Sequence, residues 1–365
     1  MDYTGKKKIL LLGLNGRAGT LHYASNISSN LAEYASVSLL LPSYSNTSII
    51  SKKVDIIKIH APPSVIKTIL LTFNIFQHIK AIKTMNKIDA DVLNILDIHP
   101  WYVMYWPFIK ARKKVVTIND PELHSGESGI IMSFLLRKIT RFLLKNADEI
   151  IVLGKKQEKT IRKLGYKQRV IVSRIGHYDF FQKNIKKNYP QEKNTILFFG
   201  RIKEYKGLRY LLEAIKFVRK RGILLKLIIA GEGDISSYKT LMDELKEYLE
   251  LHIGYVPDEK VAELFQRCTF VVMPYTDATQ TGVVQVAYSF KKPVIATNVG
   301  SLPEVVIDNK TGIIVPSRNS KALAEAIIKM LNNPKDTMKK GLEAYKFMKK
   351  ELDWKKIAKE LYEKY

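Results

Sequence analysis

ILFFGRIKEYKG, at residues 196–207, has the pattern of a buried strand, a short loop and the start of a helix. The apolar run Ile196–Phe199 predicts the strand, and Gly200 ends it. From Leu208 onward, apolar residues recur at helical spacing. The loop in between therefore follows the carboxyl end of a strand, which is where open α/β sheets bind their ligands.

Two cations on this loop, Arg201 and Lys206, are suited to a pyrophosphate. A guanidinium offers a planar fork of N–H donors, and an ammonium group acts as a point charge. The other interpretation is a solvated basic loop, since the chain has 60 Lys and Arg residues in all. Taken alone, the stretch leaves both interpretations open.

The length and composition of the chain indicate a globular protein of two domains. Its 365 residues exceed what one ordinary core holds, and 46% of them are apolar and 26% charged. The single cysteine, Cys268, excludes an internal disulfide and fits a reducing compartment. The net charge of +25 indicates an acidic partner, and three classes fit: a nucleic acid, an anionic membrane or a phosphate-bearing substrate.

No apolar window approaches the roughly 18 residues that a membrane-spanning helix needs. At the N-terminus, the basic residues 6–8 and the apolar residues 9–12 have the order of a signal peptide, but the apolar part is short and no small-residue cleavage site follows. We therefore expect a first strand and a glycine-rich turn there. We also expect a cytoplasmic protein, at most peripheral on the inner face of the cell membrane.

Predicted strands and helices alternate in two successive runs along the chain, separated by a polar stretch. This order predicts an α/β protein of two Rossmann-like doubly wound domains facing across a cleft. The expected parts are an N-terminal domain at 1–181, a linker at 182–193 and a C-terminal domain at 194–340. Residues 341–365 are expected to form helices that pack back on the N-terminal domain, with Trp354 as an anchor.

Four blocks in the second half of the chain resemble a known family. They are ILFFGRIKEYKGLRYLLEA at 196–214, LIIAGEG at 227–233, VVMPYTDATQTGVVQVAYSFKKPVIATNVGSLPEVV at 271–306 and TGIIVP at 311–316. Their order and spacing resemble the donor domain of retaining GT-B glycosyltransferases of family four, the group 1 type. In the first half, AGTLHYASNISSNLAE at 18–33 resembles the family's glycine loop and first helix, and VVTINDPELHSGE at 115–127 resembles its acceptor-side loop.

The resemblance implies a nucleotide-diphosphate sugar as donor, with no separate cofactor and no metal. Arg201 and Lys206 would hold the diphosphate and stabilise the leaving group, which makes them the expected catalytic residues. The further positions implied to contact the donor are Gly19, Gly231, Glu232, Gly233, Gln280, Thr281, Gly282 and Val283. Gln280 and Thr281 are the expected sugar contacts, and the amides of Gly282 and Val283 are expected at a helix N-terminus. No Cys or His cluster has metal-ligand spacing.

Some positions depart from the family pattern. Many members carry two Glu side chains where this chain has Ala278 and Val286. The string Thr-Gln-Thr-Gly at 279–282 fits a subgroup with a Thr-Gln-Ser-Gly-like sequence in the same place. The carboxylates that usually lie near the sugar and on the ribose are therefore not expected here.

The acceptor side also departs from the pattern, since Asn119 stands where the family usually has a His. His124, five residues on, is either its substitute or an ordinary surface-loop His. Asp120 either orders the loop as a turn or cap residue or lies near the acceptor hydroxyl. His22, beside a predicted strand–loop junction, has a structural or solvated role as its alternative. These four residues are the acceptor-side candidates.

The expected function is a retaining, metal-independent hexosyltransferase-type enzyme. It would move a sugar from a nucleotide-diphosphate donor to a hydroxyl of a glycan or lipid-linked glycan, in cell-surface polysaccharide or glycan biosynthesis. The missing carboxylates and His motivate an alternative, a catalytically silent GT-B subunit that scaffolds a partner enzyme. No nucleic acid is expected as a partner, because no RNP-like, helix-turn-helix or zinc-finger signature accompanies the charge.

Three basic stretches of the first half point to a membrane as a further partner. Residues 64–88 and 130–145 have basic amphipathic patterns, and residues 101–114 mix aromatic side chains with Lys and Arg. Stretches of this kind lie on anionic membranes. The other interpretation is helices that pack on a sheet and expose a Lys-rich face to solvent.

Overall fold

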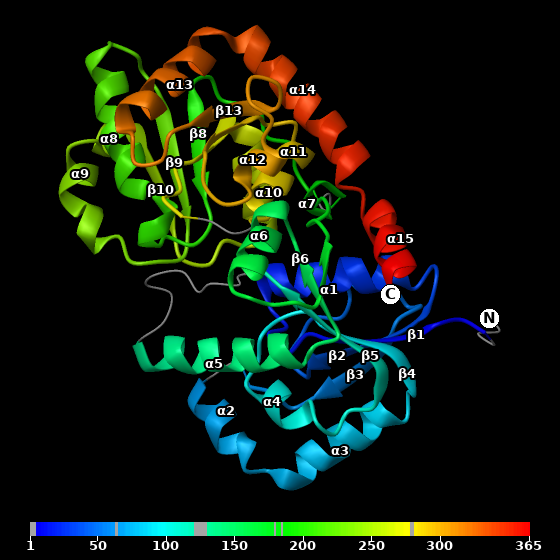
Figure 1. Cartoon of the computed structure of the whole chain (residues 1–365). Coiled ribbons are helices and arrows are strands. Elements are labelled where there is room, and N and C mark those ends of the chain that lie inside the picture. The colour runs from blue at the N-terminus through cyan, green and yellow to red at the C-terminus, as the bar shows by residue number, and fades with distance from the viewer. Residues whose placement is uncertain (1–4, 63–64, 120–129, 179, 184, 278–280) are drawn as a thin grey trace. The chain divides into compact units, whose positions relative to one another are not determined.

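The computed structural model describes residues 5–62, 65–119, 130–178, 180–183, 185–277 and 281–365, and Figure 1 labels its elements. The described chain forms two compact units, each built on a parallel β-sheet. The first unit holds residues 5–119, 130–175 and 354–365, and the second holds the described residues between 176 and 353. The expected α/β class with two doubly wound domains is confirmed.

The first unit is built on a seven-stranded sheet in the order β3-β2-β1-β4-β5-β6-β7. Its strands are β1 (Lys8–Leu12), β2 (Ser36–Pro42), β3 (Asp55–Ile59), β4 (Ala90–Ile95), β5 (Ala111–Ile118), β6 (Glu149–Val152) and β7 (Arg169–Val172). Its helices are α1 (Ala18–Leu31), α2 (Val65–Thr72), α3 (Ile75–Asn86), α4 (Trp101–Tyr105), α5 (Ile130–Asn146), α6 (Lys155–Lys163) and α15 (Trp354–Lys364).

Both faces of this sheet are covered, which explains the unbroken apolar runs of its strands. Because side chains alternate along a strand, Ile9 and Leu11 lie on the face that carries α1 and α15. Leu10 and Leu12 lie on the opposite face, which carries α3, α4 and α5. All four side chains are fully buried.

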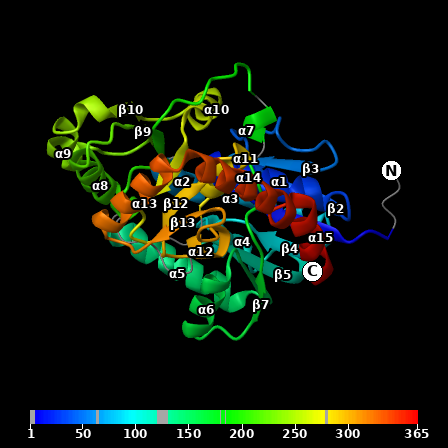
Figure 2. The same cartoon turned by 90° about the horizontal axis from the view of Figure 1, so that it is seen from above.

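The helix α15 completes the core of the first unit. It lies beside α1 in both views (Figures 1 and 2), and the ring of Trp354 meets that of Tyr23 edge-on at a centroid distance of 5.7 Å. The buried side-chain amide of Asn94 on β4 donates to the Tyr365 hydroxyl at 2.6 Å and accepts from the Thr117 hydroxyl at 2.9 Å. The last residues of the sequence are therefore bonded into the centre of the first sheet.

The second unit is built on a six-stranded sheet in the order β10-β9-β8-β11-β12-β13. Its strands are β8 (Thr195–Phe199), β9 (Lys226–Gly231), β10 (Leu249–Ile253), β11 (Phe270–Met273), β12 (Val294–Thr297) and β13 (Gly312–Val315). Its α-helices are α7 (Phe180–Lys183), α8 (Leu208–Lys220), α9 (Lys239–Asp243), α10 (Asp258–Arg267), α11 (Val283–Ser289), α12 (Leu302–Val305), α13 (Ser320–Asn332) and α14 (Pro334–Glu351). Short 3-10 turns lie at Glu204–Lys206, Ser236–Tyr238 and Lys246–Tyr248. The helices α8 and α13 lie side by side in Figures 1 and 2 and share one core with the strands.

Each sheet has one point where the order of its strands reverses. In the first sheet β1 lies between β2 and β4, and in the second sheet β8 lies between β9 and β11. Ligands of open α/β sheets bind beyond the carboxyl ends of the strands at such a point. The loop with Arg201 and Lys206 follows β8, so it lies at the reversal point of the second sheet.

The boundaries of the two units differ from the expected ones. Residues 341–351, which we expected on the N-terminal domain, form the second part of α14, and this helix packs against α11 and α13 in the second unit. Its Gly341 lies so close to the turn between α11 and β12 that a Cβ there would fall 2.0 Å from the carbonyl oxygen of Lys291. Only the chain from Trp354 onward belongs to the first unit again. The expected linker is also part of the second unit, where Glu192 pairs with Arg267 at 2.5 Å.

The aromatic side chains of residues 101–114 divide between core and surface. Trp101, Tyr102 and Tyr105 on α4 are fully buried, and Trp106 is nearly so, whereas Phe108 is exposed. The short helix packs the four buried rings on the sheet beside β4 and β5, so these rings supply core rather than a membrane contact. Within the described ranges, no helix is both long and apolar enough to span a bilayer.

Candidate active site

The loop that follows β8 is bonded to the turn that follows β9. The N–H of Gly200 donates to the carbonyl of Ala230 at 2.9 Å, and the N–H of Ile202 donates to that of Glu232 at 2.7 Å. These bonds extend the pairing of β8 and β9 beyond the ends of the two strands. They bring Arg201, which is exposed, directly beside the predicted turn Gly231-Glu232-Gly233.

Two glycines make this approach possible. A Cβ at Gly231 would fall 2.0 Å from the carbonyl oxygen of Gly200, and a Cβ at Gly233 would fall 2.2 Å from that of Ile202. The backbone φ angles of the two glycines are 145° and 157°. A residue with a Cβ would be strained at these angles. The backbones of the two loops touch because neither position carries a side chain.

The ammonium of Lys206 lies over an aromatic ring from the loop that follows the neighbouring strand β11. Its Nζ is 3.8 Å from the centroid of Tyr275 and 5.1 Å from that of Tyr205. The N–H of Thr276 donates to the carbonyl of Tyr205 at 2.8 Å, which holds the loops after β8 and β11 together. A cation over a ring face is attracted to it. Tyr275 therefore positions the predicted phosphate-binding Lys206.

Sequence reasoning missed Tyr275, although a signal for it was present. The residue comes two positions after a buried strand that is a direct neighbour of β8. Parallel neighbours end at the same edge of a sheet, so an aromatic side chain there is within reach of the β8 loop. The pairing of the two strands was needed to use this signal, and the order of strands in a sheet is a tertiary property.

The segment before α11 is closed by local hydrogen bonds. The N–H of Val283 donates to the Thr281 hydroxyl at 3.2 Å. The buried Gln285, with its amide oriented to donate, bonds the carbonyl of Thr281 at 2.7 Å. Gly282 faces the ring of Tyr178, since a Cβ there would fall 2.6 Å from it. The amide of Val283, which we expected to be offered to the donor, is thus bonded to the Thr281 side chain in this structure.

The predicted Gln280 and the position of Ala278 lie outside the described residues. Val286, at the position of the family's second Glu, is described and buried in α11. In the second unit, the described part of the donor set therefore consists of two cations, the glycine turn and the Thr281–Val283 segment.

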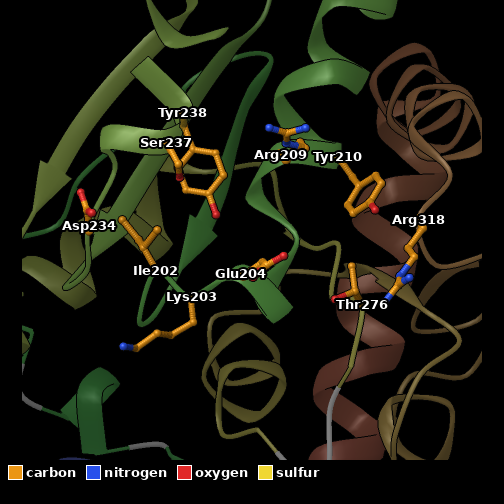
Figure 3. Close-up of a pocket in the computed structure, with 10 residues that line it drawn as sticks. All are labelled: Ile202, Lys203, Glu204, Arg209, Tyr210, Asp234, Ser237, Tyr238, Thr276 and Arg318. Atoms are coloured by element: carbon orange, nitrogen blue, oxygen red, sulfur yellow. The ribbon is translucent and has the colours of Figure 1, made fainter. Parts of the chain in front are cut away.

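A cavity of about 660 Å³ lies beside the same loop (Figure 3). In the view of Figure 3, Tyr210, Thr276 and Arg318 lie on one side of it, and Asp234, Ser237 and Tyr238 lie on the other. Arg201 and Lys206 are not among its lining residues. The cavity is lined by both basic and acidic side chains. None of the described residues expected to contact the donor lines it, so we do not assign it as the donor site.

In the first unit, the glycine-rich loop after β1 is held by a buried carboxylate after β4. The N–H of Asn15 donates to Asp97 Oδ2 at 2.8 Å, and the Tyr102 hydroxyl donates to Oδ1 at 3.0 Å. The same hydroxyl accepts from the N–H of Leu14 at 2.9 Å. Burial raises the pKa of Asp97 to about 6, against the lowering effect of these bonds. Asp97 is a positioning residue at the reversal point of the first sheet.

Three of the remaining predicted residues, Gly19, His22 and Asn119, lie on described parts of the first unit. Gly19 is exposed in the first turn of α1, with open space where a Cβ would be. His22 is half-buried on the same helix, and its carbonyl accepts from the Asn26 side chain at 2.8 Å. The side-chain oxygen of Asn119 is buried and has no hydrogen-bond partner among the residues that the structure describes. Asp120 and His124 lie outside the described residues.

The histidine that follows β4 has a structural role. His99 is buried, and its Nδ1 accepts from the N–H of Trp101 at 3.3 Å, at the start of α4. Burial lowers its pKa to about 4, so the imidazole is neutral at physiological pH. Across the described ranges, no three His, Cys, Asp or Glu side chains gather closely enough to hold a metal ion.

Comparisons with known proteins identify relatives of both units. Residues 193–333 match the family described as "Glycosyl transferases group 1". An uncharacterized glycosyltransferase of Methanocaldococcus jannaschii is 29% identical over 277 residues, which cover 75% of each chain. The sucrose-phosphate synthase of Thermosynechococcus elongatus has a similar structure, with a TM-score of 0.77, 19% identity and coverage of 99% of this chain and 98% of the other. The Anabaena protein HepE, solved in complex with UDP, has a TM-score of 0.73, 15% identity and coverage of 98% of this chain and 99% of the other.

The close approach at Gly231 leads to a prediction about stability. We expect Gly231→Ala to lower the free energy of unfolding by roughly 3 kcal/mol or more, because a Cβ strains the backbone and clashes with a carbonyl oxygen. The matched control is Gly222→Ala, which also has a positive φ, at 71°, but has nothing within 4 Å of its Cβ position. Gly222→Ala should lower the free energy of unfolding by only roughly 1 kcal/mol. Urea unfolding measures both, and equal losses would contradict the role of the contact.

Asp97 leads to a prediction about pH. Its pKa of about 6 in the folded state lies above the ordinary 3.8, so the folded state binds the proton more tightly than the unfolded chain. The stability that this proton contributes is complete below about pH 4 and is lost as the pH rises through about 6. Asp97→Asn does not titrate, so its unfolding free energy should rise by up to about 3 kcal/mol relative to the wild type between about pH 4 and pH 7.

Urea unfolding across this pH range provides the measurement for Asp97. A difference between Asp97→Asn and the wild type that stays constant with pH would refute the assignment. Tyr102→Phe serves as a companion variant, because it removes a hydrogen bond that favours the charged carboxylate. Tyr102→Phe should therefore raise the pKa of Asp97. Stability should still fall as the pH rises, but over a higher pH range than in the wild type.

Proposed function

Since the chain is a GT-B glycosyltransferase of the group 1 type, we propose that it moves a sugar from a nucleotide-diphosphate donor to a hydroxyl of a glycan or lipid-linked glycan. The observation that carries the proposal is the β8 loop. It presents Arg201 and Lys206 at the reversal point of the second sheet, with the ammonium of Lys206 3.8 Å from the centroid of Tyr275. HepE, which shares the fold, was solved with UDP, so a uridine nucleotide is the first donor class to test.

The two cations have a defined role in the proposed reaction. The bond between the sugar C1 and the diphosphate oxygen breaks, and negative charge accumulates on the departing nucleoside diphosphate. Arg201 and Lys206 stabilise this charge by electrostatic attraction and N–H donation. Because the cations themselves neutralise the leaving group, the proposed chemistry needs no metal and no cofactor other than the nucleotide sugar.

The proposed reaction retains the configuration at C1. The acceptor hydroxyl attacks on the face that the leaving group vacates, and its proton passes to an oxygen of the departing phosphate. The new bond joins C1 to the acceptor oxygen, so charges and protons balance without a protein base. This route suits a chain with Asn119 in place of the family's usual His and Val286 in place of a Glu.

The acceptor and compartment form the finer part of the proposal. We propose a role in cell-surface polysaccharide or glycan biosynthesis, on the cytoplasmic side, where the buried thiol of Cys268 stays reduced. A nucleotide sugar is the small-molecule partner, and the acceptor is a sugar hydroxyl on a growing chain. The alternative, a catalytically silent subunit that scaffolds a partner enzyme, rests on the same missing carboxylates and His.

Substitution of the two cations tests the proposal. Arg201→Ala and Lys206→Ala should each lower kcat by about 100-fold or more, because each removes stabilisation of the leaving group's charge. Donor hydrolysis and sugar transfer from a panel of nucleotide sugars give the readout. Lys220→Ala, which removes an exposed cation at the far end of α8, is the matched control and should keep full activity. Full activity in either loop variant would refute the role of the pair.

Two further measurements separate the enzyme from a silent scaffold. A nucleotide-sugar donor should raise the melting temperature of the wild type, and Lys206→Ala should abolish that shift. A silent scaffold would show neither donor hydrolysis nor the shift.

The stereochemistry of the product provides a separate prediction. A retaining enzyme should give a product with the same anomeric configuration as the donor, and proton NMR of the first turnovers reads this directly. Inversion at C1 would rule out same-face attack.

A further inference from the structure

The turn between α2 and α3 exposes an apolar surface. We use the name α2–α3 corner for its exposed large apolar side chains, which are Ile69, Leu70, Phe73, Ile75, Phe76 and Ile79. Phe73 and Phe76 have 77% and 87% of their surface exposed. Figure 1 shows the two helices meeting at an angle on the side away from the strands. Soluble proteins rarely expose so many large apolar side chains together, and such patches mark interaction sites.

Polar contacts on its inner side hold the α2–α3 corner in place. The indole N–H of Trp101 donates to the Thr72 hydroxyl at 2.9 Å. The buried ring of His78 bonds the Tyr105 hydroxyl at 2.8 Å, and Asn74 caps the first turn of α3. The inward positions are therefore already occupied by residues bonded to the core. The apolar side chains point outward because the helices are anchored on their opposite side.

Within its own stretch of chain, the α2–α3 corner carries acidic side chains nowhere and basic ones on both helices. Residues 56–88 contain no Asp or Glu. On α3, Phe76, Lys80 and Lys83 follow one another at helical i, i+4 and i+7 spacing, which places them on one face, and the two Lys side chains are exposed. Lys67 on α2 is exposed as well. Apolar side chains and cations thus share a surface on which no acidic side chain of this stretch is present.

We propose that the α2–α3 corner docks the protein on an anionic lipid bilayer. The aromatic and aliphatic side chains would enter the boundary between head groups and acyl chains, and the flanking Lys side chains would meet lipid phosphates. This combination of apolar side chains and cations is what an interfacial membrane helix presents. Of the three stretches that the sequence marked as candidates, residues 64–88 carry this contact.

A second copy of the chain fits the surface less well than a bilayer. Two copies that met through the same corner would bring Lys67, Lys80 and Lys83 of one chain against those of the other. Like charges in such an interface repel each other, whereas an anionic bilayer attracts all of them. Charge complementarity therefore selects the bilayer as the occupant.

Cosedimentation of the full chain with vesicles tests the proposal. The wild type should bind phosphatidylcholine vesicles that contain about 30% phosphatidylglycerol, and it should bind pure phosphatidylcholine much less. The double variant Phe73→Ser/Phe76→Ser should reduce the partition coefficient on the anionic vesicles by about tenfold or more. Lys80→Glu/Lys83→Glu should reduce it as well and should remove most of its dependence on salt.

The matched control is Leu224→Ser, which removes an apolar side chain of similar exposure, 73%, from the second unit. It should leave the partition coefficient unchanged. Equal binding of the Phe73→Ser/Phe76→Ser variant and the wild type would overturn the proposal, and so would failure of the wild type to bind either vesicle. Loss of a concentration-dependent dimer in the double variant, without any vesicle binding by the wild type, would assign the surface to self-association and overturn it too.

The membrane proposal stands independently of the proposed sugar transfer. Vesicle binding has a readout that does not involve the donor, and the α2–α3 corner lies in a different unit from Arg201 and Lys206. Lys206→Ala should therefore bind vesicles like the wild type while losing transfer. The Phe73→Ser/Phe76→Ser variant should keep the donor-induced shift in melting temperature, so a failure of either proposal is recognised separately.

Discussion

The contact between the loop after β8 and the turn after β9 is the constraint on which the candidate active site depends. Two backbone segments lie so close that a Cβ at Gly231 or Gly233 would fall 2.0 to 2.2 Å from a carbonyl oxygen of the other segment. Hydrogen bonds at 2.9 and 2.7 Å continue the strand pairing past the ends of the strands. The loop with Arg201 thereby takes a definite path, although loops after strands are otherwise free to vary.

The second anchor of that loop is the aromatic ring of Tyr275, from the loop that follows the neighbouring strand β11. Tyr275 lies beneath the ammonium of Lys206, and the N–H of Thr276 bonds the carbonyl of Tyr205 at 2.8 Å. One side of the loop is thus tied to β9 and the other to β11, the two strands that flank β8. A pair of cations held in this way needs little reorganisation when charge develops on a leaving group, which is the condition under which electrostatic stabilisation is most effective. This chain lacks the two Glu side chains that many members of the family have near the donor. We therefore expect the pre-organised cations to supply more of the transition-state stabilisation than in those members.

In the first unit, the loops at the reversal point are held together through a side chain. Its reversal point joins the loops after β1 and β4 through the buried carboxylate of Asp97, which accepts from the Asn15 N–H and the Tyr102 hydroxyl. A buried carboxylate with a pKa of about 6 changes charge close to physiological pH, so this loop is tied by a group that senses pH, whereas the β8 loop is tied by backbone and a ring. Asp97 comes two positions after the buried strand β4, and that place is the signal by which it could have been found.

Periodicity and spacing in the sequence were enough to predict the α/β class, the two doubly wound units, the cations on a loop after a strand and a turn at Gly231–Gly233, whereas only the family resemblance implied that this turn borders the same ligand as the cations. Each of these is encoded within a short stretch, where apolar runs mark buried strands and glycines mark close approaches. Only the tertiary structure decided that Tyr275 lies under Lys206, that Asp97 holds the Asn15 loop, and that α14 stays with the second unit while α15 joins the first. It also decided that the aromatics of residues 101–106 fill the core whereas those of the α2–α3 corner face outward. The physical reason is that local sequence fixes which face of an element is apolar, but the elements that cover that face come from distant parts of the chain.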